Sequence, residues 1–382
     1  MDRRSLAVAI IICLCFGAIH ACGVLLVPIE HWIGISRTQA SLVYSSAIVS
    51  LTMGVYLAGC LEALLVLQRC LIACGLVAAI GLLLAAMSSN FNGLLVGFSV
   101  IYGLVNGVAY SLSLGVAARA LAGREGRALG FATAAYGLGA VLFAQIFEVS
   151  VQLMDMALLL VLLAAINLVV CLAGAALARN GRRQSLPAMS QGGEGFSRHL
   201  LLLWTCYLLG AFSGLMVLAH APSIAAWYGS NRAGVVAGLV SFGSVAGSYI
   251  GGFMAERVSG RVGLSLPLFL QMAAIASVPL GATLPVVIVA LVLSGLCYGA
   301  LTAAVPVEVL RKSGTIGFGR DYGKVVTAWG LAGVAGPVTA GYLYDMTGGY
   351  STSLSVAAVL SAASCLLIIG VRFAPIADNE HA

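Results

Sequence analysis

The chain has 382 residues, of which 61% are hydrophobic and only 8% are charged, and its formal net charge is +6. A soluble domain carries roughly 25% charged residues, so this composition excludes a globular protein with a solvated surface and predicts one that crosses the bilayer many times. The positive charge does not indicate a nucleic-acid partner, because the charged residues lie in short loops between apolar runs, as orientation in a membrane requires.

Apolar runs long enough to span a bilayer occur in two groups of six. They lie near 6–29, 38–64, 70–89, 92–118, 127–150 and 154–178, and then near 200–224, 233–255, 263–283, 285–308, 323–344 and 350–373. A polar stretch separates the two groups. The sequence therefore predicts an all-α membrane protein of twelve helices, with an N-terminal six-helix bundle over 1–178, a cytoplasmic linker over 179–199 and a C-terminal six-helix bundle over 200–382.

The basic residues predict the orientation of these helices. If Met1 lies in the cytoplasm, all 19 lysines and arginines except Arg37 and Arg232 lie there as well. Because cytoplasmic loops carry the excess of basic residues, we expect both termini in the cytoplasm and the protein in a bacterial plasma (inner) membrane. The first apolar run has no clear small-residue cleavage site, so we expect it to remain as a spanning helix.

The two groups of runs repeat each other. Thr133-Ala-Ala-Tyr136-Gly corresponds to Val326-Thr-Ala-Trp329-Gly, 193 positions later. Tyr102-Gly-Leu-Val-Asn106-Gly corresponds to Ser294-Gly-Leu-Cys-Tyr298-Gly, 192 positions later. A nearly constant offset predicts two pseudo-symmetric bundles of common origin. Parallel repeats of this kind place a substrate site near the bilayer midplane, between the halves.

A short charged loop follows the run 233–255. It reads Gly252-Phe-Met-Ala-Glu256-Arg257-Val-Ser-Gly260-Arg261 and must be an aqueous turn, because these charges cannot lie in lipid. The pattern resembles the signature loop of the major facilitator superfamily. The resemblance implies that Glu256 caps a neighbouring helix and pairs with arginine, and that Glu256, Arg257, Gly260 and Arg261 latch one conformation of a transporter. The first-half counterpart, from Gly59 to Arg69, is degenerate.

Two further segments resemble one branch of this superfamily. They read Ser213-Gly-Leu-Met216-Val-Leu-Ala-His220-Ala-Pro222 and Thr327-Ala-Trp329-Gly-Leu-Ala-Gly-Val-Ala-Gly336-Pro337. Both look like the oxalate/formate antiporter and monocarboxylate transporter branch. The resemblance implies secondary active transport of a small organic solute, a monocarboxylate or related anion, by rocker-switch alternating access. The driving partner is a proton or a counter-substrate, and we expect a monomer without cofactors.

The sequence departs from that branch where the branch typically holds its carboxylate with basic residues. These positions fall near Ser248 and Trp329, which carry no charge, and no Lys or Arg lies centrally in any run. Desolvating a carboxylate without a positive partner is costly. Simple dicarboxylate exchange is therefore disfavoured, while a monocarboxylate, a zwitterion or a larger, weakly charged molecule stays open.

His20, inside the first run, is the candidate for both substrate binding and proton coupling. An imidazole is costly in hydrocarbon and ordinarily titrates near neutrality; the alternative is a histidine that only hydrogen-bonds a neighbouring helix. The other substrate-binding candidates are the polar, aromatic and sulfur-bearing residues of the runs: Asn106, Tyr110, Tyr136, Met216, His220, Ser248, Tyr298 and Trp329, with Tyr44 and Gln271 as weaker ones. Several of them would form an aromatic box around a planar ligand.

Other classes of function have less support. Met216 and His220 share a helix face, so soft ligands for copper(I) are an alternative, completed by Cys15, His20 and Cys22. The cysteines otherwise read as buried apolar residues, and no metal is expected. No phosphate-binding G-x-x-x-x-G-K-[ST] loop is present, and no aqueous domain exists to hold a catalytic site. A non-transporting receptor with the same fold remains the alternative from another class.

Overall fold

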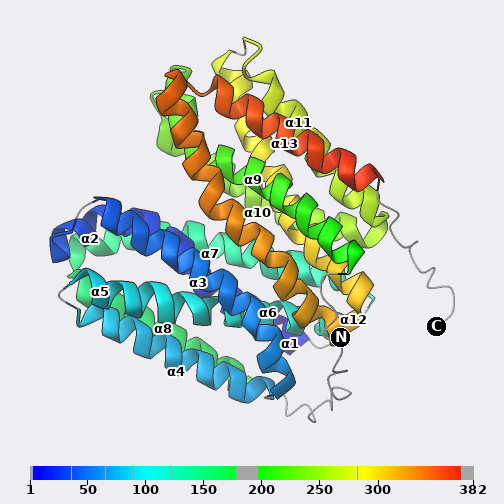
Figure 1. The fold of residues 1–382 in the computed structure, drawn as a ribbon. Helices are drawn as coiled ribbons and strands as arrows, with labels where there is room; N and C mark the ends of the chain where they lie inside the picture. The colour runs from blue at the N-terminus through cyan, green and yellow to red at the C-terminus, as the bar shows by residue number, and fades with distance from the viewer. Residues whose placement is uncertain are drawn as a thin grey trace. The chain divides into compact units, whose positions relative to one another are not determined.

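The computed structural model describes residues 3–35, 37–64, 66–88, 90–121, 123–177, 197–281 and 283–370, and their regular elements are all helical (Figure 1). The first half contains α1 Arg3–Phe16, η1 Gly17–Leu25, α2 Leu26–Ile33, α3 Arg37–Leu64, α4 Leu67–Ala86, α5 Phe91–Leu94, η2 Leu95–Tyr102, α6 Gly103–Ala120, α7 Glu125–Leu153 and α8 Met156–Leu177. The second half contains α9 Arg198–Trp227, α10 Ala233–Arg257, α11 Gly260–Ser277, α12 Leu284–Thr347 and α13 Ser351–Gly370.

Eleven of the described helical segments are long and apolar enough to cross a membrane. One of them, α12, has 64 residues. At 1.5 Å per residue it would measure about 96 Å, roughly three times the apolar thickness of a bilayer. Its backbone leaves the helical region at Gly314, where φ is 64°, a value that glycine adopts without strain. This break divides α12 into two spans, so the prediction of a twelve-helix membrane protein is confirmed.

Two of the spans are not regular α-helices. In the first, α1 gives way to a nine-residue 3₁₀ segment, η1. In the fourth, an eight-residue π-helical segment, η2, precedes α6. Long 3₁₀ runs and π segments are uncommon and often mark functional positions or hinges. Neither segment could be predicted from the sequence, because both are as apolar as a normal spanning helix.

The repeat seen in the sequence has a counterpart in how the helices pack. Gly54 of α3 and Gly107 of α6 each lie so close to the backbone of the other helix that no side-chain carbon fits. Gly247 of α10 and Gly299 of α12, at the equivalent positions of the second half, lie against each other's helices in the same way. Small residues of this kind let helices pack closely in a membrane.

The described residues cluster into two compact units. The first draws on Met1–Gly123, Ala135–Gly195 and Thr315–Gly330, and the second on Arg124–Ala134, Phe196–Gly314 and Leu331–Ala382. Both α7 and α12 therefore contribute to each unit. The bundle boundaries at 178 and 200 remain a prediction, and residues 179–196 of the predicted linker lie outside the described residues.

Candidate functional site

His20 lies in the 3₁₀ segment η1 and is surrounded by aromatic side chains of the first unit. The rings of Tyr136 and Trp329 meet it edge to face, with centroids 5.3 and 6.0 Å away. Its Nδ1 lies 3.5 Å from the hydroxyl of Tyr44 on α3. Among the described residues, no partner is found for Nε2. His20 and Trp329 are only partly buried, so this group, the His20 cluster, combines a titratable ring with accessible aromatic surface.

Close backbone contacts bring the cluster together. Gly17 of η1 lies against the backbone of Tyr136 and Gly139 on α7, and Gly139 lies against the carbonyl of Leu14. A side chain at either glycine would push α7 away from η1. The two glycines therefore set the distance between His20 and the Tyr136 ring.

Asn106 holds Tyr136 in place. The Tyr136 hydroxyl donates to Asn106 Oδ1 at 2.6 Å, and Asn106 Nδ2 donates to the carbonyl of Phe16 at 2.7 Å. Phe16 is the last residue of α1, at the change to 3₁₀ geometry. Asn106 is fully buried, and both the oxygen and the nitrogen of its amide are hydrogen-bonded to protein groups. Tyr110 lies one turn further along α6, and its ring centroid is 4.5 Å from that of Tyr136.

The remaining predicted binding residues belong to the second unit. Tyr298 packs against Gly214, and Met216 is buried in the apolar core of this unit. The Ser248 hydroxyl donates to the carbonyl of Ser244 on its own helix, at 3.0 Å. The structure thus gathers five of the nine candidates, His20, Asn106, Tyr110, Tyr136 and Trp329, in the first unit; Tyr44, a weaker candidate in sequence, has the hydrogen-bond contact with His20.

His220 has protein partners at both ring nitrogens. Nδ1 lies 3.3 Å from the Tyr350 hydroxyl, and Nε2 lies 3.1 Å from the carbonyl of Pro337. Since a carbonyl only accepts, Nε2 carries a hydrogen in this arrangement. These contacts tie α9 to α12 and to the start of α13. Among the residues that the structure describes, no three His, Cys, Asp or Glu side chains are arranged to hold a metal ion.

Glu256, in the signature loop, caps the beginning of α7. Its Oε1 accepts from the backbone N–H of Arg127 at 2.5 Å, and its Oε2 lies 3.0 Å from Arg127 Nε, an ion pair without hydrogen-bond geometry. A carboxylate at a helix N-terminus is stabilised by the free N–H groups and the helix dipole. Gly126 and Gly130 of α7 lie against Gly252 of α10, and these three glycines define what we call the α7–α10 contact.

The other side of the signature loop is held by α12. The Arg311 guanidinium donates to the carbonyls of Ala255 and Val258, at the end of α10, and to Glu308 at 2.5 Å. The nearly buried Glu308 carboxylate lies against Gly260, the first residue of α11. One ion pair therefore places a cation at the C-terminus of α10 and an anion at the N-terminus of α11, as both helix dipoles favour.

Gly260→Ala is expected to destabilise the protein, because the added methyl group would occupy the position of the Glu308 carboxylate. The carboxylate would have to move away from Arg311, to which it is hydrogen-bonded, and a hydrogen bond to a charged group contributes about 1.5–3 kcal/mol. Thermal unfolding of the purified protein in detergent checks this. Gly238→Ala is the matched control, since a methyl group there meets open space. Equal melting temperatures for the two variants would contradict the role assigned to Gly260.

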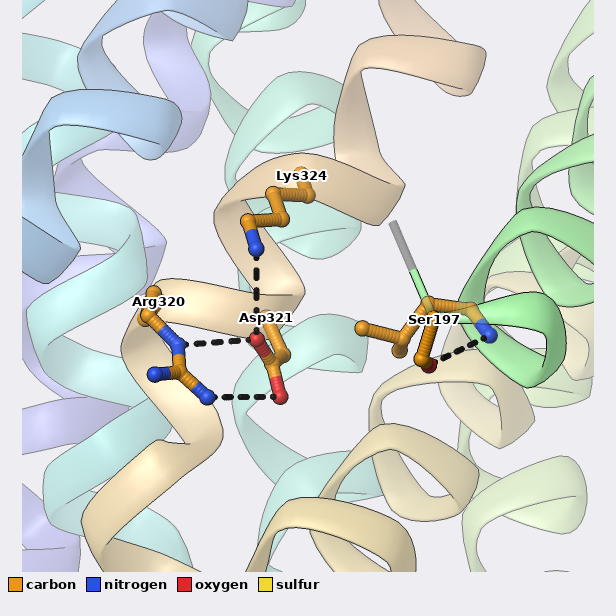
Figure 2. Close-up of polar contacts among 5 residues, drawn as sticks. Ser197, Arg320, Asp321 and Lys324 are labelled. Carbon is orange, nitrogen blue, oxygen red and sulfur yellow. Dashed lines mark hydrogen bonds and ion pairs between the residues drawn. The ribbon is translucent and has the colours of Figure 1, made fainter. Parts of the chain in front are cut away.

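A third group of charges lies on α12 beyond the Gly314 break. Asp321 Oδ1 is 3.0 Å from Arg320 Nε and 3.9 Å from Lys324 Nζ, and Figure 2 shows both cations turned toward the one carboxylate. The same view shows Ser197, whose hydroxyl accepts from the N–H of Leu200 and caps α9. The contacts drawn in this view join residues that are close in the chain.

The chain is similar to named transporters in sequence and in structure. No protein-family model matches it. It is 27% identical over 314 residues to monocarboxylate transporter 13 of Rattus norvegicus. The matched region covers 77% of this chain and 71% of that protein. The Bos taurus protein of the same name gives the same identity over 312 residues.

Solved structures of major facilitator superfamily transporters share the fold. The E. coli fucose:proton symporter FucP has a TM-score of 0.74 at 16% identity, over 95% of this chain and 97% of that one. The human organic anion transporter MFSD10 has a TM-score of 0.73 at 18% identity, over 96% and 99%. The chain therefore has the major facilitator superfamily fold that its signature loop predicts.

Proposed function

We propose that the protein is a secondary active transporter of a small organic anion, with a monocarboxylate as the first candidate and a proton as the coupled ion. The observation that supports this best is the His20 cluster, a partly accessible imidazole in a spanning segment with aromatic rings around it. The sequence relatives named monocarboxylate transporter 13 point to the same class of substrate.

His20 supplies the positive charge that the sequence otherwise lacks in the middle of its spans. A protonated imidazole offsets the cost of moving a carboxylate into a low-dielectric site. A neutral imidazole favours the return of the empty transporter, because a charged side chain without a counter-ion is costly in a site closed off from water. Substrate and proton are therefore bound together and released together, and the loaded site carries no net charge from the pair. Tyr44 orients the ring through Nδ1, which leaves Nε2 for the substrate.

Asn106 and Tyr110 act indirectly in this scheme, because they fix the Tyr136 ring that meets His20. Trp329 supplies a second ring against His20. His220, Met216, Ser248 and Tyr298 are proposed as second-half contributors to the site, as the repeat implies, with His220 engaged by Tyr350 and Pro337 in the state described here.

The signature loop sets the conformational balance in this proposal. Glu256 holds α7 through Arg127. Arg257, Gly260 and Arg261 complete the latch between the end of α10 and the start of α11. Alternating access by a rocker-switch motion requires the α7–α10 contact to form and break in each cycle. The Glu256 cap stabilises the state in which the contact is formed.

A neutral solute is the second candidate, because aromatic rings with few charges also suit sugars, and FucP is named as a fucose:proton symporter. In that case the His20 proton is carried without a carboxylate partner.

Thermal-shift measurements on the purified protein test which solute binds, because a ligand of the native state raises its melting temperature. Monocarboxylates, dicarboxylates, zwitterions, sugars and copper(I) are compared at pH 5.5 and pH 7.5. We expect stabilisation by monocarboxylates, stronger at the lower pH. Stabilisation by sugars alone or by copper(I) alone would replace the anion proposal with the corresponding alternative.

A further inference from the structure

Phe253 carries two arginines on one aromatic ring. The guanidinium carbon of Arg257 lies 3.9 Å from the ring centroid and that of Arg127 lies 4.6 Å from it. Glu256 and Arg257 lie three and four positions after Phe253 on α10, so each is a neighbour of Phe253 on the surface of that helix. The ring therefore contacts Arg127 of the ion pair and lies one helical turn from Glu256.

The Arg127–Glu256 ion pair would be stabilised by a neighbouring aromatic ring, because solvent reaches both of its side chains. The side chains of Arg127 and Glu256 are 25% and 13% exposed, and a partly exposed pair is weakened by solvent and salt. Arg257 is a second cation, next to Glu256 in the chain, and an arginine can pair with the carboxylate of its chain neighbour, as Arg320 does with Asp321. A guanidinium stacked on an aromatic face is held by the ring quadrupole and is more weakly hydrated than an ammonium.

We propose that Phe253 is a positioning residue of the latch. Its ring holds the Arg127 guanidinium beside Glu256 and gives Arg257 a separate place, so that Glu256 binds the arginine of α7 and not the one of its own helix. This inference rests on the proposed role of Glu256 as a latch. When α7 leaves α10, the ring loses Arg127 and keeps Arg257.

Fluorination of Phe253 separates this role from simple packing. Each fluorine withdraws electron density from the ring and weakens its attraction for a cation, while the shape of the ring changes little. A ring that only fills space would tolerate the series 4-fluoro-, 3,5-difluoro- and 3,4,5-trifluorophenylalanine. Phe253→Trp, with a stronger π face, is the rescue variant, and Phe253→Leu removes the quadrupole altogether.

The reporter is a cysteine pair at positions 131 and 249. The ring centroids of Phe131 on α7 and Tyr249 on α10 lie 4.9 Å apart. In a full-length variant whose ten native cysteines are replaced by alanine, a short bifunctional thiol reagent joins the pair when the contact is formed. We expect cross-linking to slow progressively along the fluorine series, by roughly two- to fivefold at three fluorines, and to recover with Trp. In Arg127→Ala the series should be flat.

A constant rate along the series, or Phe253→Leu cross-linking as fast as the parent, would overturn this role for Phe253. The Glu256→Gln variant in the same reporter separates the two claims. If Glu256→Gln slows cross-linking but the fluorine series does not, the latch stands and the inference about Phe253 fails. If neither changes the rate, the latch itself fails, and with it the basis of the inference.

Discussion

Replacing His20 by alanine is expected to lower proton-driven uptake of a monocarboxylate by at least about tenfold, equivalent to about 1.4 kcal/mol of lost stabilisation. The physical reason is that His20 is the titratable group of the cluster, with its Nδ1 beside Tyr44 and its ring against Tyr136 and Trp329. Without the imidazole, no group in the cluster balances the carboxylate charge. Uptake into proteoliposomes at fixed protein density measures the effect.

The control for this variant is His31→Ala. His31 belongs to α2, next along the chain from η1, but its side chain is exposed, so its removal should leave uptake unchanged. Melting temperatures of both variants show whether folding is intact. Full uptake by a correctly folded His20→Ala protein would remove the proposed substrate site.

Neutralising the latch by Glu256→Gln is expected to shift the protein toward the state with an open α7–α10 contact by roughly fivefold, or about 1 kcal/mol. The glutamine keeps the size of the side chain and can still accept from the Arg127 N–H, but the ion pair with Arg127 is lost. A hydrogen bond to a charged acceptor contributes about 1.5–3 kcal/mol and one between neutral groups about 0.5–1.5 kcal/mol. The weaker bond from the Arg127 N–H and the loss of a partly exposed ion pair, itself worth about 0–1 kcal/mol, together give the expected shift. The cross-linking rate of cysteines at 131 and 249 measures the shift.

Glu148→Gln serves as the matched control, because Glu148 lies on the same helix, α7, and is exposed. High salt provides a second control: it should bring the parent closer to Glu256→Gln, since screening weakens an exposed ion pair. Identical cross-linking of Glu256→Gln, Glu148→Gln and parent would rule out the latch.

The fold could be predicted because its signals are long-range averages. Spans of twenty apolar residues and the near-constant offset between the halves both survive uncertainty at single positions. The merged helix α12 illustrates the limit: the sequence places two spans there, while the polar segment between them continues as helix to the break at Gly314.

The candidate site was predictable only in part, and for a physical reason. Tyr136 and Trp329 stand at equivalent positions of the repeat, and both rings meet His20. The side chains that orient these two rings depend on the local backbone geometry, which cannot be predicted from composition. The 3₁₀ geometry of η1 leaves the Phe16 carbonyl beside Asn106, and Tyr44 reaches His20 from another helix.

The signature loop shows the same division. Its own residues carried the resemblance, but its partners come from distant segments. Arg127 is 129 positions away from Glu256, and Arg311 binds the carbonyls at the end of α10. The spacing of Phe253, Glu256 and Arg257 on one helix face was visible in the sequence, whereas the second cation on the Phe253 ring was not.

The most direct test of the account is coupled flux in proteoliposomes that contain only this protein. A monocarboxylate is added outside, without an imposed pH gradient, while external pH and accumulated substrate are recorded together. If His20 couples the two fluxes, the outside becomes alkaline in step with uptake, one proton per carboxylate, and both signals are lost in His20→Ala. Carboxylate uptake without proton movement, or proton movement driven only by sugars, would contradict it.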